Sequence, residues 1–336
     1  MQAALLTFIA SAGVIIVTGS ILTHYVDDLA EKTGLGRLLL GSILLAGATS
    51  LPELVTDVSA VRAGYVDLAV GDLMGSSLFN LLILAIADLA FHHPGKMLSR
   101  LAFRHVLSGT LSITLTAFAA MSIMMGAQFE RWSIGRVGIG SWLILIAYLL
   151  GARLLYFDQQ VGKKSENDDH SAGASNPADR KAIARSLLVI AACAVAIMFT
   201  GPQLAHSAEK IAEITGLGGT FIGTTLVALS TSLPELVSTI TALRLGAMDL
   251  AIGNIFGSNT FNMTIIVVLD FVSASPLLPL VSPTHAVTGI CVIIVTSVVL
   301  MGQLYQVESR KRFLEPDAWL VILMILASLT MIYQIR

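Results

Sequence analysis

The sequence predicts an all-α, polytopic membrane protein whose ten transmembrane helices form two inverted five-helix repeats. Three observations support this fold class. The 336 residues are 55% hydrophobic and only 12% charged, whereas a soluble domain carries about 25% charged residues. Apolar runs of bilayer-spanning length, about 17–25 residues, recur along the whole chain. Residues 19–80 align without a gap on residues 201–262, a shift of 182 positions.

Ten apolar runs are candidate spans. The first has no basic residue before it and no clear small-residue cleavage site, so we interpret it as a retained span and not as a signal peptide. Cys193 and Cys291 fall within predicted spans and are typical of small core residues, so neither a disulfide nor a metal site is indicated. Residues 24–33 and 206–215 are predicted to form separate short surface helices, each ended by a glycine. The predicted spans are residues 3–22, 38–62, 66–91, 101–124, 137–157, 185–204, 219–243, 248–273, 284–302 and 317–335.

The basic residues of the predicted loops indicate how the chain is oriented. Fourteen Lys and Arg residues fall in the loops after the first, third, fifth, seventh and ninth spans, and five fall on the other side. Cytoplasmic loops carry the excess of positive charge. Both termini are therefore predicted to lie outside the cytoplasm, with the chain in a bacterial inner (plasma) membrane. The net charge of −2 is close to neutral and indicates no particular partner.

The two halves of the chain repeat one design. Between residues 41–80 and 223–262, 21 of the 40 aligned residues are identical, which indicates an internal duplication. Each half contains five predicted spans, so the second half enters the membrane from the opposite side, as in the inverted repeats of secondary transporters. The predicted domains are a first repeat at 1–158, a polar cytoplasmic linker at 159–184 and a second repeat at 185–336.

An identical hexapeptide, TSLPEL, occurs once in each half. A proline within a helix removes a backbone donor and clashes with the carbonyl four residues earlier. It therefore predicts a broken helix, with freed carbonyls around Ala46–Ala48 and Ala228–Ser230. Membranes tolerate such a break only where it is buried in protein or lines a wet cavity. Glu53 and Glu235 follow the prolines, and an ionised acid at the bilayer centre costs about 2.5–3.5 kcal/mol on insertion scales, which favours a functional role over a purely architectural kink.

A second motif follows in each half, GDLMGSSLFN at residues 71–80 and GNIFGSNTFN at residues 253–262. Its two glycines allow either close approach of another helix or local unwinding, and Gly-x-x-x-Gly is also a common packing face. Four residues separate the first serine from the last asparagine, so both are predicted to lie on one helix face. The asparagine could instead serve to hydrogen-bond a neighbouring helix.

Together the two motifs offer only oxygen ligands: carboxylates, hydroxyls, amide carbonyls and freed main-chain carbonyls. Such a set suits a hard cation that takes about six to eight oxygens, with Ca²⁺ as the leading candidate. Softer metals prefer imidazole or thiolate. Two glutamates balance one Ca²⁺ in charge, and similar ligands hold Na⁺. The candidate ligands are Glu53, Glu235, Thr49, Thr231, Ser50, Ser232, Ser76, Ser258, Asn80, Asn262, Ala46 and Ala228.

Two acidic residues of the first repeat have no acidic counterpart in the second. Asp57 aligns with Thr239, and Asp72 aligns with Asn254. Either aspartate could tune the charge of the site or a proton pathway. Because they lack the symmetry of the glutamates, they are predicted to stand behind the ligands rather than among them.

The paired TSLPEL and GS(S/N)xFN blocks resemble the alpha-repeats of the cation/calcium exchanger superfamily, in particular its sodium/calcium exchanger branch. The resemblance covers nearly the whole chain. It implies a fold of ten helices in which the second, third, seventh and eighth spans surround the site. It also implies that the long, tilted first and sixth spans slide across this core to switch access.

The resemblance implies a role for each matched position. Glu53 and Glu235 would be the central Ca²⁺ ligands. Thr49 and Thr231 would supply hydroxyl and carbonyl ligands, and Asn80 and Asn262 would be the remaining central ligands. The flanking Na⁺ sites would use the carbonyls of Ala46 and Ala228 and the hydroxyls of Ser76 and Ser258.

Three departures from the family pattern stand out. Ala48 and Ser230 replace the usual glycine before Thr-Ser, a small change that affects the width of the site. Asn262 stands where some microbial and potassium-dependent members carry aspartate, which weakens the case for potassium dependence. Asp72 stands where the repeat normally has asparagine.

These features predict a secondary active antiporter that exchanges Ca²⁺ for Na⁺ by alternating access, without enzymatic activity or a cofactor. No P-loop motif is visible, so an ion gradient is expected to supply the energy. The nearest alternative is a Ca²⁺/H⁺ antiporter that uses the same glutamates; a passive cation channel and an intramembrane acid hydrolase are more distant ones. The predicted partners are Ca²⁺, Na⁺ or H⁺, and the lipid bilayer, with no nucleic acid and no protein partner.

Overall fold

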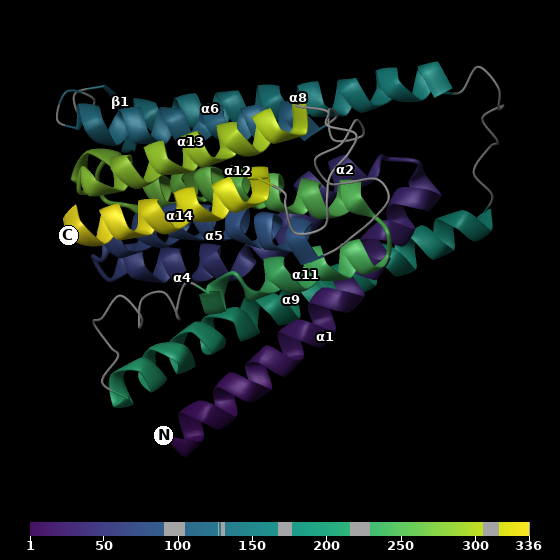
Figure 1. The fold of residues 1–336 in the computed structure, drawn as a ribbon, viewed down its shortest axis with the longest axis horizontal. Coiled ribbons are helices and arrows are strands. Elements are labelled where there is room, and N and C mark those ends of the chain that lie inside the picture. Colours follow the sequence, from purple (N-terminus) through teal and green to yellow (C-terminus); the bar gives the residue numbers. More distant parts are fainter. Residues whose placement is uncertain are drawn as a thin grey trace.

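A computed structural model of the chain describes residues 1–90, 105–126, 128, 132–166, 177–215, 229–304 and 316–335. These residues are almost entirely helical (Figure 1). Seven of the described helices are long and apolar enough to cross a membrane, and a bent pair, residues 37–49 and 51–62, is an eighth if it counts as one span. The predicted all-α, polytopic fold class is confirmed. Ten spans cannot be counted within these residues, because the predicted span at 219–243 is described only from Leu229 onward.

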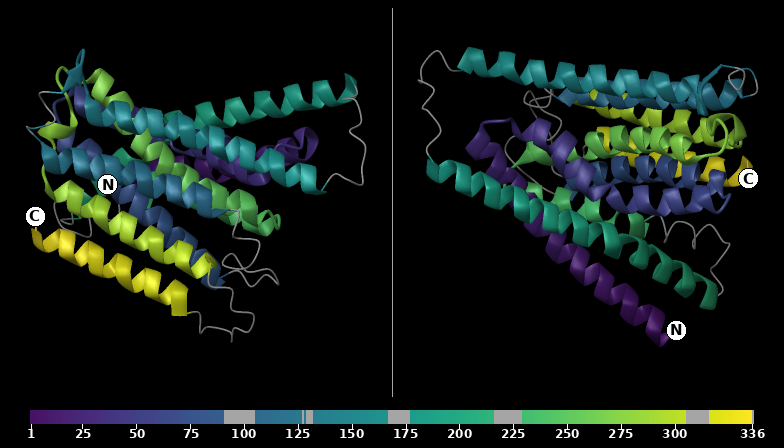
Figure 2. Two further views of the ribbon diagram at one scale, coloured as in Figure 1. Left: turned by 90° about the horizontal axis from the view of Figure 1, so that it is seen from above. Right: turned by 180° about the vertical axis from the view of Figure 1, so that it is seen from behind.

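The two longest described helices, α1 (Gln2–Thr33) and α9 (Pro177–Ile214), pack side by side on one flank of the bundle (Figures 1 and 2). Only 22% of the most apolar stretch of each is buried, as expected for helices that face lipid. The prediction of separate surface helices at 24–33 and 206–215 is wrong. No proline or glycine interrupts residues 24–33, so α1 continues to Gly34, whose φ of 61° ends it.

The predicted linker at 159–184 is helical at both of its ends. The helix α8 (Ile139–Glu166) extends into it from the first repeat, and α9 begins at Pro177. Residues 167–176 lie outside the described part of the chain. The connection between the two long helices is therefore shorter than the composition of the segment predicts.

The second predicted span is broken at the hexapeptide. Its four parts are α2 (Arg37–Leu40), the π-helix η1 (Gly41–Leu45), α3 (Ala46–Thr49) and α4 (Leu51–Arg62). The bend between the part before Ser50 and the part after it is 46°. Pro52 lies in the first turn of α4, where backbone N–H groups have no acceptor within the helix, so the missing N–H costs no hydrogen bond.

The second repeat contains the same break, before α11 (Leu233–Arg244). Ser50 has φ −89° and ψ 9°, and its counterpart Ser232 has φ −83° and ψ 7°. The prolines Pro52 and Pro234 lie at the same position of the helix that follows. The duplicated hexapeptide therefore folds twice into the same local structure.

The centre of the bundle is the helix pair α5 (Val66–Ala90) and α12 (Met248–Val272). These helices contact each other, and 72% of the most apolar stretch of each is buried. Both run unbroken through the glycine motifs, so local unwinding does not occur. Close approach does occur at Gly253 and Gly257, where an added Cβ would lie 2.8 Å from the Leu38 carbonyl oxygen and 2.5 Å from Ser42 Cα, respectively.

Replacing Gly257 with alanine is expected to lower the midpoint of thermal unfolding. The new methyl group would force α12 away from η1, and overpacking of this kind costs about 1–3 kcal/mol. Gly13→Ala is the matched control, because Gly13 is a helical glycine with no atom within 4 Å of an added Cβ. Both variants are compared with the parent protein in the same detergent. Equal midpoints for the two variants would contradict the close packing.

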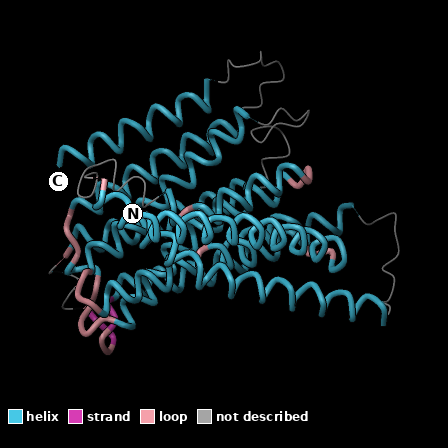
Figure 3. Tube along the Cα trace, turned by 90° about the horizontal axis from the view of Figure 1, so that it is seen from below, coloured by secondary structure: helices cyan, strands magenta, loops and turns pink. Residues whose placement is uncertain are grey.

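The remaining elements cover the side of the central pair that lies opposite α1 and α9 (Figures 1 and 2). The strands β1 and β2 form a short antiparallel hairpin at one end of the bundle (Figure 3). The bounds of these elements are Val106–Met125 for α6, Ser133–Ile134 for β1, Val137–Gly138 for β2, Leu278–Leu280 for η4, Thr284–Leu304 for α13 and Pro316–Ile335 for α14.

Acidic residues near the ends of α5 and α12 hold neighbouring segments. Asp270 accepts hydrogen bonds from the main-chain N–H groups of Gly138 at 2.9 Å and Leu277 at 2.7 Å. Asp67 accepts one from Ser282 N–H at 2.7 Å, and Asp249 Oδ1 lies 3.0 Å from a nitrogen of His105. Asp67 and Asp249 lie in the first turns of their helices, where a negative charge interacts favourably with the positive end of the helix dipole.

Candidate cation site

Glu53 and Glu235 occupy the same place in the two repeats, the first turn of the helix after each break. Each residue is only 1% exposed. The two breaks face each other, because Ser50 Oγ donates a hydrogen bond across the repeats to Glu235 Oε1 at 3.3 Å. Glu53 follows Ser50 by three residues, in the first turn of the helix that begins directly after this serine. The structure thus brings the two acids into one buried site.

The first break supplies further oxygens around this site. Thr49 is fully buried, and its hydroxyl lies near the Glu235 carboxylate and 3.5 Å from Asn254 Oδ1. The Ala46 carbonyl is not freed by the break, because it accepts Ser50 N–H at 3.0 Å and the Thr49 hydroxyl at 3.2 Å. The carbonyl that loses its helical donor to Pro52 is the one four residues earlier, that of Ala48.

The second break is described from Leu229 onward. Thr231 and Ser232 are buried, and Ser232 Oγ has no hydrogen-bond partner among the described residues. Ala228, the predicted counterpart of Ala46, lies outside the described residues. The described part of this break therefore carries two buried hydroxyl residues within four positions of Glu235, as Thr49 and Ser50 precede Glu53 in the first repeat.

The asparagines of the second motif are held by their amide nitrogens. Asn80 Nδ2 donates to Asn259 Oδ1 at 3.0 Å, and Asn262 Nδ2 donates to the Leu73 carbonyl and to Ser77 Oγ, both at 3.4 Å. These bonds join α5 to α12. They leave Asn80 Oδ1 and Asn262 Oδ1 buried without a partner in the described structure. Each amide therefore presents an unused carbonyl oxygen.

Unpartnered buried oxygens gather on the predicted ligands. Leaving a buried polar atom unsatisfied costs about 1–3 kcal/mol, and native structures seldom do so without a reason. A dehydrated hard cation would satisfy several such oxygens at once. No Lys or Arg occurs among the buried polar side chains of the described residues, so no basic side chain there balances the two glutamates. Among the candidate ligands in the described part of the chain these oxygens belong to Glu53, Glu235, Ser76, Ser258, Ser232, Asn80 and Asn262, and other described residues, Asp57 and Asp72 among them, also carry such oxygens.

Two residues of this site were missed by reasoning from the sequence. Asn259 and Ser77 occupy equivalent positions in the two repeats, 182 residues apart. They contact each other, because Asn259 Nδ2 donates to the Ser77 carbonyl at 3.1 Å. The signal that could have revealed them is a polar residue at matching positions of the repeated apolar helices α5 and α12, the most buried of the described spans.

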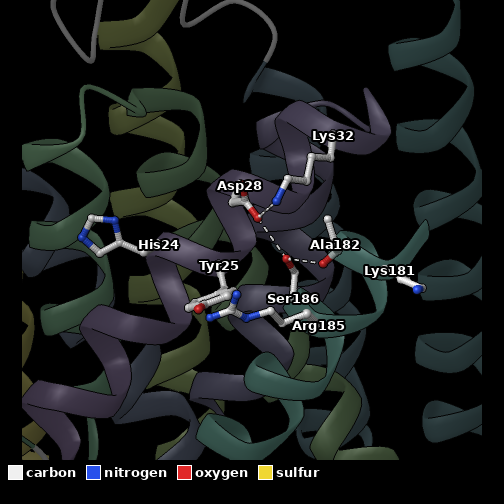
Figure 4. A pocket seen from close by; sticks show the side chains of 8 residues that line it. All are labelled: His24, Tyr25, Asp28, Lys32, Lys181, Ala182, Arg185 and Ser186. Atoms are coloured by element: carbon white, nitrogen blue, oxygen red, sulfur yellow. Dashed lines mark hydrogen bonds and ion pairs between the residues drawn. The ribbon is translucent and has the colours of Figure 1, made fainter. Parts of the chain in front are cut away.

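A separate polar pocket of about 600 Å³ lies between α1 and α9 (Figure 4). Asp28 on α1 accepts hydrogen bonds from Lys32 Nζ at 2.6 Å and from Ser186 Oγ of α9 at 2.9 Å. His24 also lines this pocket. None of the candidate ligands lines it, so we interpret it as a polar contact region between α1 and α9 that is separate from the cation site.

Comparison with known proteins follows the same division into halves. Residues 3–157 and 185–335 match the family model described as "Sodium/calcium exchanger protein". The sodium/calcium exchanger MaX1 of Methanosarcina acetivorans is 28% identical over 273 residues, 73% of this chain and 75% of the relative. The Ca²⁺/H⁺ antiporter ChaA of Bacillus subtilis is 25% identical over 268 residues, 78% of this chain and 75% of the relative.

The fold is also shared with a solved exchanger. A structure of the sodium-calcium exchanger NCX_Mj superposes with a TM-score of 0.70 over the whole of both chains. The sequence identity is 18%, so this likeness concerns the fold alone. Because the family model covers both halves, the chain belongs to the sodium/calcium exchanger protein family.

Proposed function

We propose that the chain exchanges Ca²⁺ for Na⁺ by alternating access at a site centred on Glu53 and Glu235. The observation that carries the proposal is the meeting of two buried carboxylates, one from each repeat, among oxygens that have no other partner in the described residues. Family membership supports the transport class, and the name of the relative MaX1 supports the pair of ions.

Charge explains why the two cargoes compete. Like charges repel strongly in a buried site, by about 4 kcal/mol for unit charges about 4 Å apart at an effective dielectric constant of 20, so a site that holds two carboxylates and no cation is unfavourable. One Ca²⁺ neutralises both carboxylates, and Na⁺ ions do so in its place. A carrier that changes access only when neutralised exchanges one cargo for the other instead of leaking either.

Movement of the outer helices would change the access to this site. Gly19 of α1 contacts Val237 of α11, and its repeat counterpart Gly201 of α9 contacts Pro52 of α4. An added Cβ would lie 3.1 Å from Val237 Cγ1 and 2.4 Å from Pro52 Cβ. Because glycine has no side chain to interlock with the neighbouring helix, α1 and α9 can slide at these crossings past the helices that carry the glutamates.

The two halves and their orientation belong to the same proposal. We infer that residues 1–158 and 185–336 are the inverted repeats and that both termini lie outside the cytoplasm of an inner membrane. The equal backbone conformation at Ser50 and Ser232 supports the repeats. The distribution of basic loop residues supports the orientation.

The Ca²⁺/H⁺ antiporter is the second candidate, and the relative ChaA favours it. Uptake of radioactive Ca²⁺ into proteoliposomes under an imposed Na⁺ or pH gradient distinguishes the two. We expect Na⁺ inside the vesicles to drive Ca²⁺ uptake. Equal uptake driven by a pH gradient without Na⁺ would favour the alternative. A rate of Ca²⁺ uptake that depends on neither the Na⁺ gradient nor the pH gradient would contradict antiport of any kind.

A further inference from the structure

One pair of positions breaks the symmetry of the repeats. In the second repeat, Asn254 Nδ2 donates a hydrogen bond to Thr239 Oγ1 at 3.2 Å, which joins α12 to α11 one turn from Glu235. The partners are neutral, and the amide supplies the proton of the bond. The first repeat carries Asp72 and Asp57 at these two positions.

Each of the two aspartates has a buried carboxylate oxygen without a partner among the described residues. Asp57 is 1% exposed, and both Asp57 Oδ2 and Asp72 Oδ2 are buried oxygens without a hydrogen-bond partner among the described residues. The helices that carry them, α4 and α5, pack together as α11 and α12 do in the second repeat, so Asp57 and Asp72 occupy the places that Thr239 and Asn254 occupy there. Where the second repeat places a donor against an acceptor, the first places two carboxyl groups.

The groups that face this pair do not offer it a positive charge. Glu53 lies one turn from Asp57 on α4 and adds a further negative charge. On α13, His285 lies against Gly71, next to Asp72 in the chain, but its Nε2 pairs with Asp67 at 3.3 Å. No Lys or Arg occurs among the buried polar side chains of the described residues.

The other titratable groups of the packed helices are exposed or engaged elsewhere. Asp249 pairs with His105, and Asp270 binds main-chain N–H groups. Asp88 is buried near the far end of α5, sixteen residues from Asp72. The exposed groups are Arg62 on α4, Arg244 on α11, Arg180, Lys181, Arg185, His206, Glu209, Lys210 and Glu213 on α9, and Tyr333 on α14.

We propose that Asp57 and Asp72 share one proton and form a proton-binding site that the second repeat replaces with the Thr239–Asn254 hydrogen bond. A carboxylic O–H on one aspartate donates to the other and restores the donor that Asn254 supplies in the second repeat. Two adjacent buried carboxylates cannot both ionise readily, so such a pair retains one proton. The pair titrates as a unit.

The site is coupled to the cation site by charge. Loss of the shared proton adds a negative charge one helical turn from Glu53, which strengthens cation binding there, and cation loading in turn favours release of the proton. The affinity for the cation is therefore expected to rise as the pair loses its proton at higher pH. This coupling rests on the proposed cation exchange, whereas proton binding by the pair does not.

Infrared spectroscopy tests proton binding directly. The double variant D57T/D72N installs the pair that the second repeat already uses, so it is the least disruptive replacement the chain offers. In an E53Q/E235Q background, which removes the central carboxyls, a carbonyl band of a protonated carboxylic acid is expected at neutral pH. The band should disappear when D57T/D72N is added, and it should persist with the exposed control E209Q. A band unchanged by D57T/D72N overturns the proposal. If that variant does not fold, D57N, whose amide supplies the missing donor, is expected to remove the band as well.

Proteoliposomes test the coupling. Na⁺-driven Ca²⁺ uptake is measured over a range of Ca²⁺ concentrations at several pH values, with equal pH on both sides of the membrane. The pH dependence of the apparent Ca²⁺ affinity is expected to weaken in D57T/D72N, and an unchanged pH dependence overturns the coupling. Absence of all Ca²⁺ flux would count against the proposed function, while the infrared band would still decide whether the pair holds a proton.

Discussion

Replacing Glu53 or Glu235 with glutamine is expected to reduce gradient-driven Ca²⁺ uptake about 30-fold or more. Removing one member of a desolvated pair of opposite charges costs about 2–5 kcal/mol, and each 1.4 kcal/mol is about a factor of ten in affinity. Glutamine keeps the size of the side chain and one carbonyl oxygen, so the loss isolates the charge. Because both glutamates serve the same ion, either single variant should fail almost as badly as the double one.

The measurement is uptake of radioactive Ca²⁺ by proteoliposomes under a Na⁺ gradient, with Glu209→Gln as the matched control. Glu209 is an exposed glutamate of α9 whose side chain is 61% exposed and pairs with His206. If both the control and E53Q/E235Q take up Ca²⁺ at the native rate, Glu53 and Glu235 do not belong to the cation site. A second readout is Ca²⁺-dependent thermal stabilisation of the purified protein, which mass action predicts for the native protein and not for the variants.

The broken helices and the buried glutamates could be predicted because their causes are local. Pro52 and Pro234 each remove a backbone donor and clash with the preceding turn, which favours a break just before them. The position of the break within the segment was harder to predict. The sequence predicts freed carbonyls around Ala46–Ala48. In the structure, helical hydrogen bonding continues to Ser50, whose N–H donates to the Ala46 carbonyl. Only tertiary packing decides how far a helix continues toward a proline.

The extent of α1 and the role of Asn259 could not be predicted for a different reason. Hydropathy falls after residue 22 because acidic residues begin there, but hydropathy measures contact with lipid and not helix continuity. Residues 24–33 contain no helix breaker, so α1 continues beyond its apolar part. Asn259 hydrogen-bonds Ser77 across helices 182 residues apart in sequence, and a spacing rule within one motif cannot reveal such a contact.

Gly201→Ala is expected to slow Ca²⁺ exchange about tenfold while leaving Ca²⁺ binding in place. The added methyl group would lie 2.4 Å from Pro52 Cβ, and overpacking costs about 1–3 kcal/mol. If α9 slides across α4 during transport, this cost falls unequally on the states along the path and lowers the rate. The glutamates keep their ligands, so thermal stabilisation by Ca²⁺ should remain.

Gly13→Ala serves again as the control, since Gly13 lies on the partner helix α1 with no atom within 4 Å of an added Cβ. Transport by G13A should match that of the native protein. If G201A also transports Ca²⁺ at the native rate, the α9–α4 crossing does not move during exchange and access must change elsewhere. If G201A loses Ca²⁺ stabilisation together with transport, the crossing shapes the site itself, because Pro52 immediately precedes Glu53. The comparison of rate with binding therefore separates a sliding contact from a supporting one.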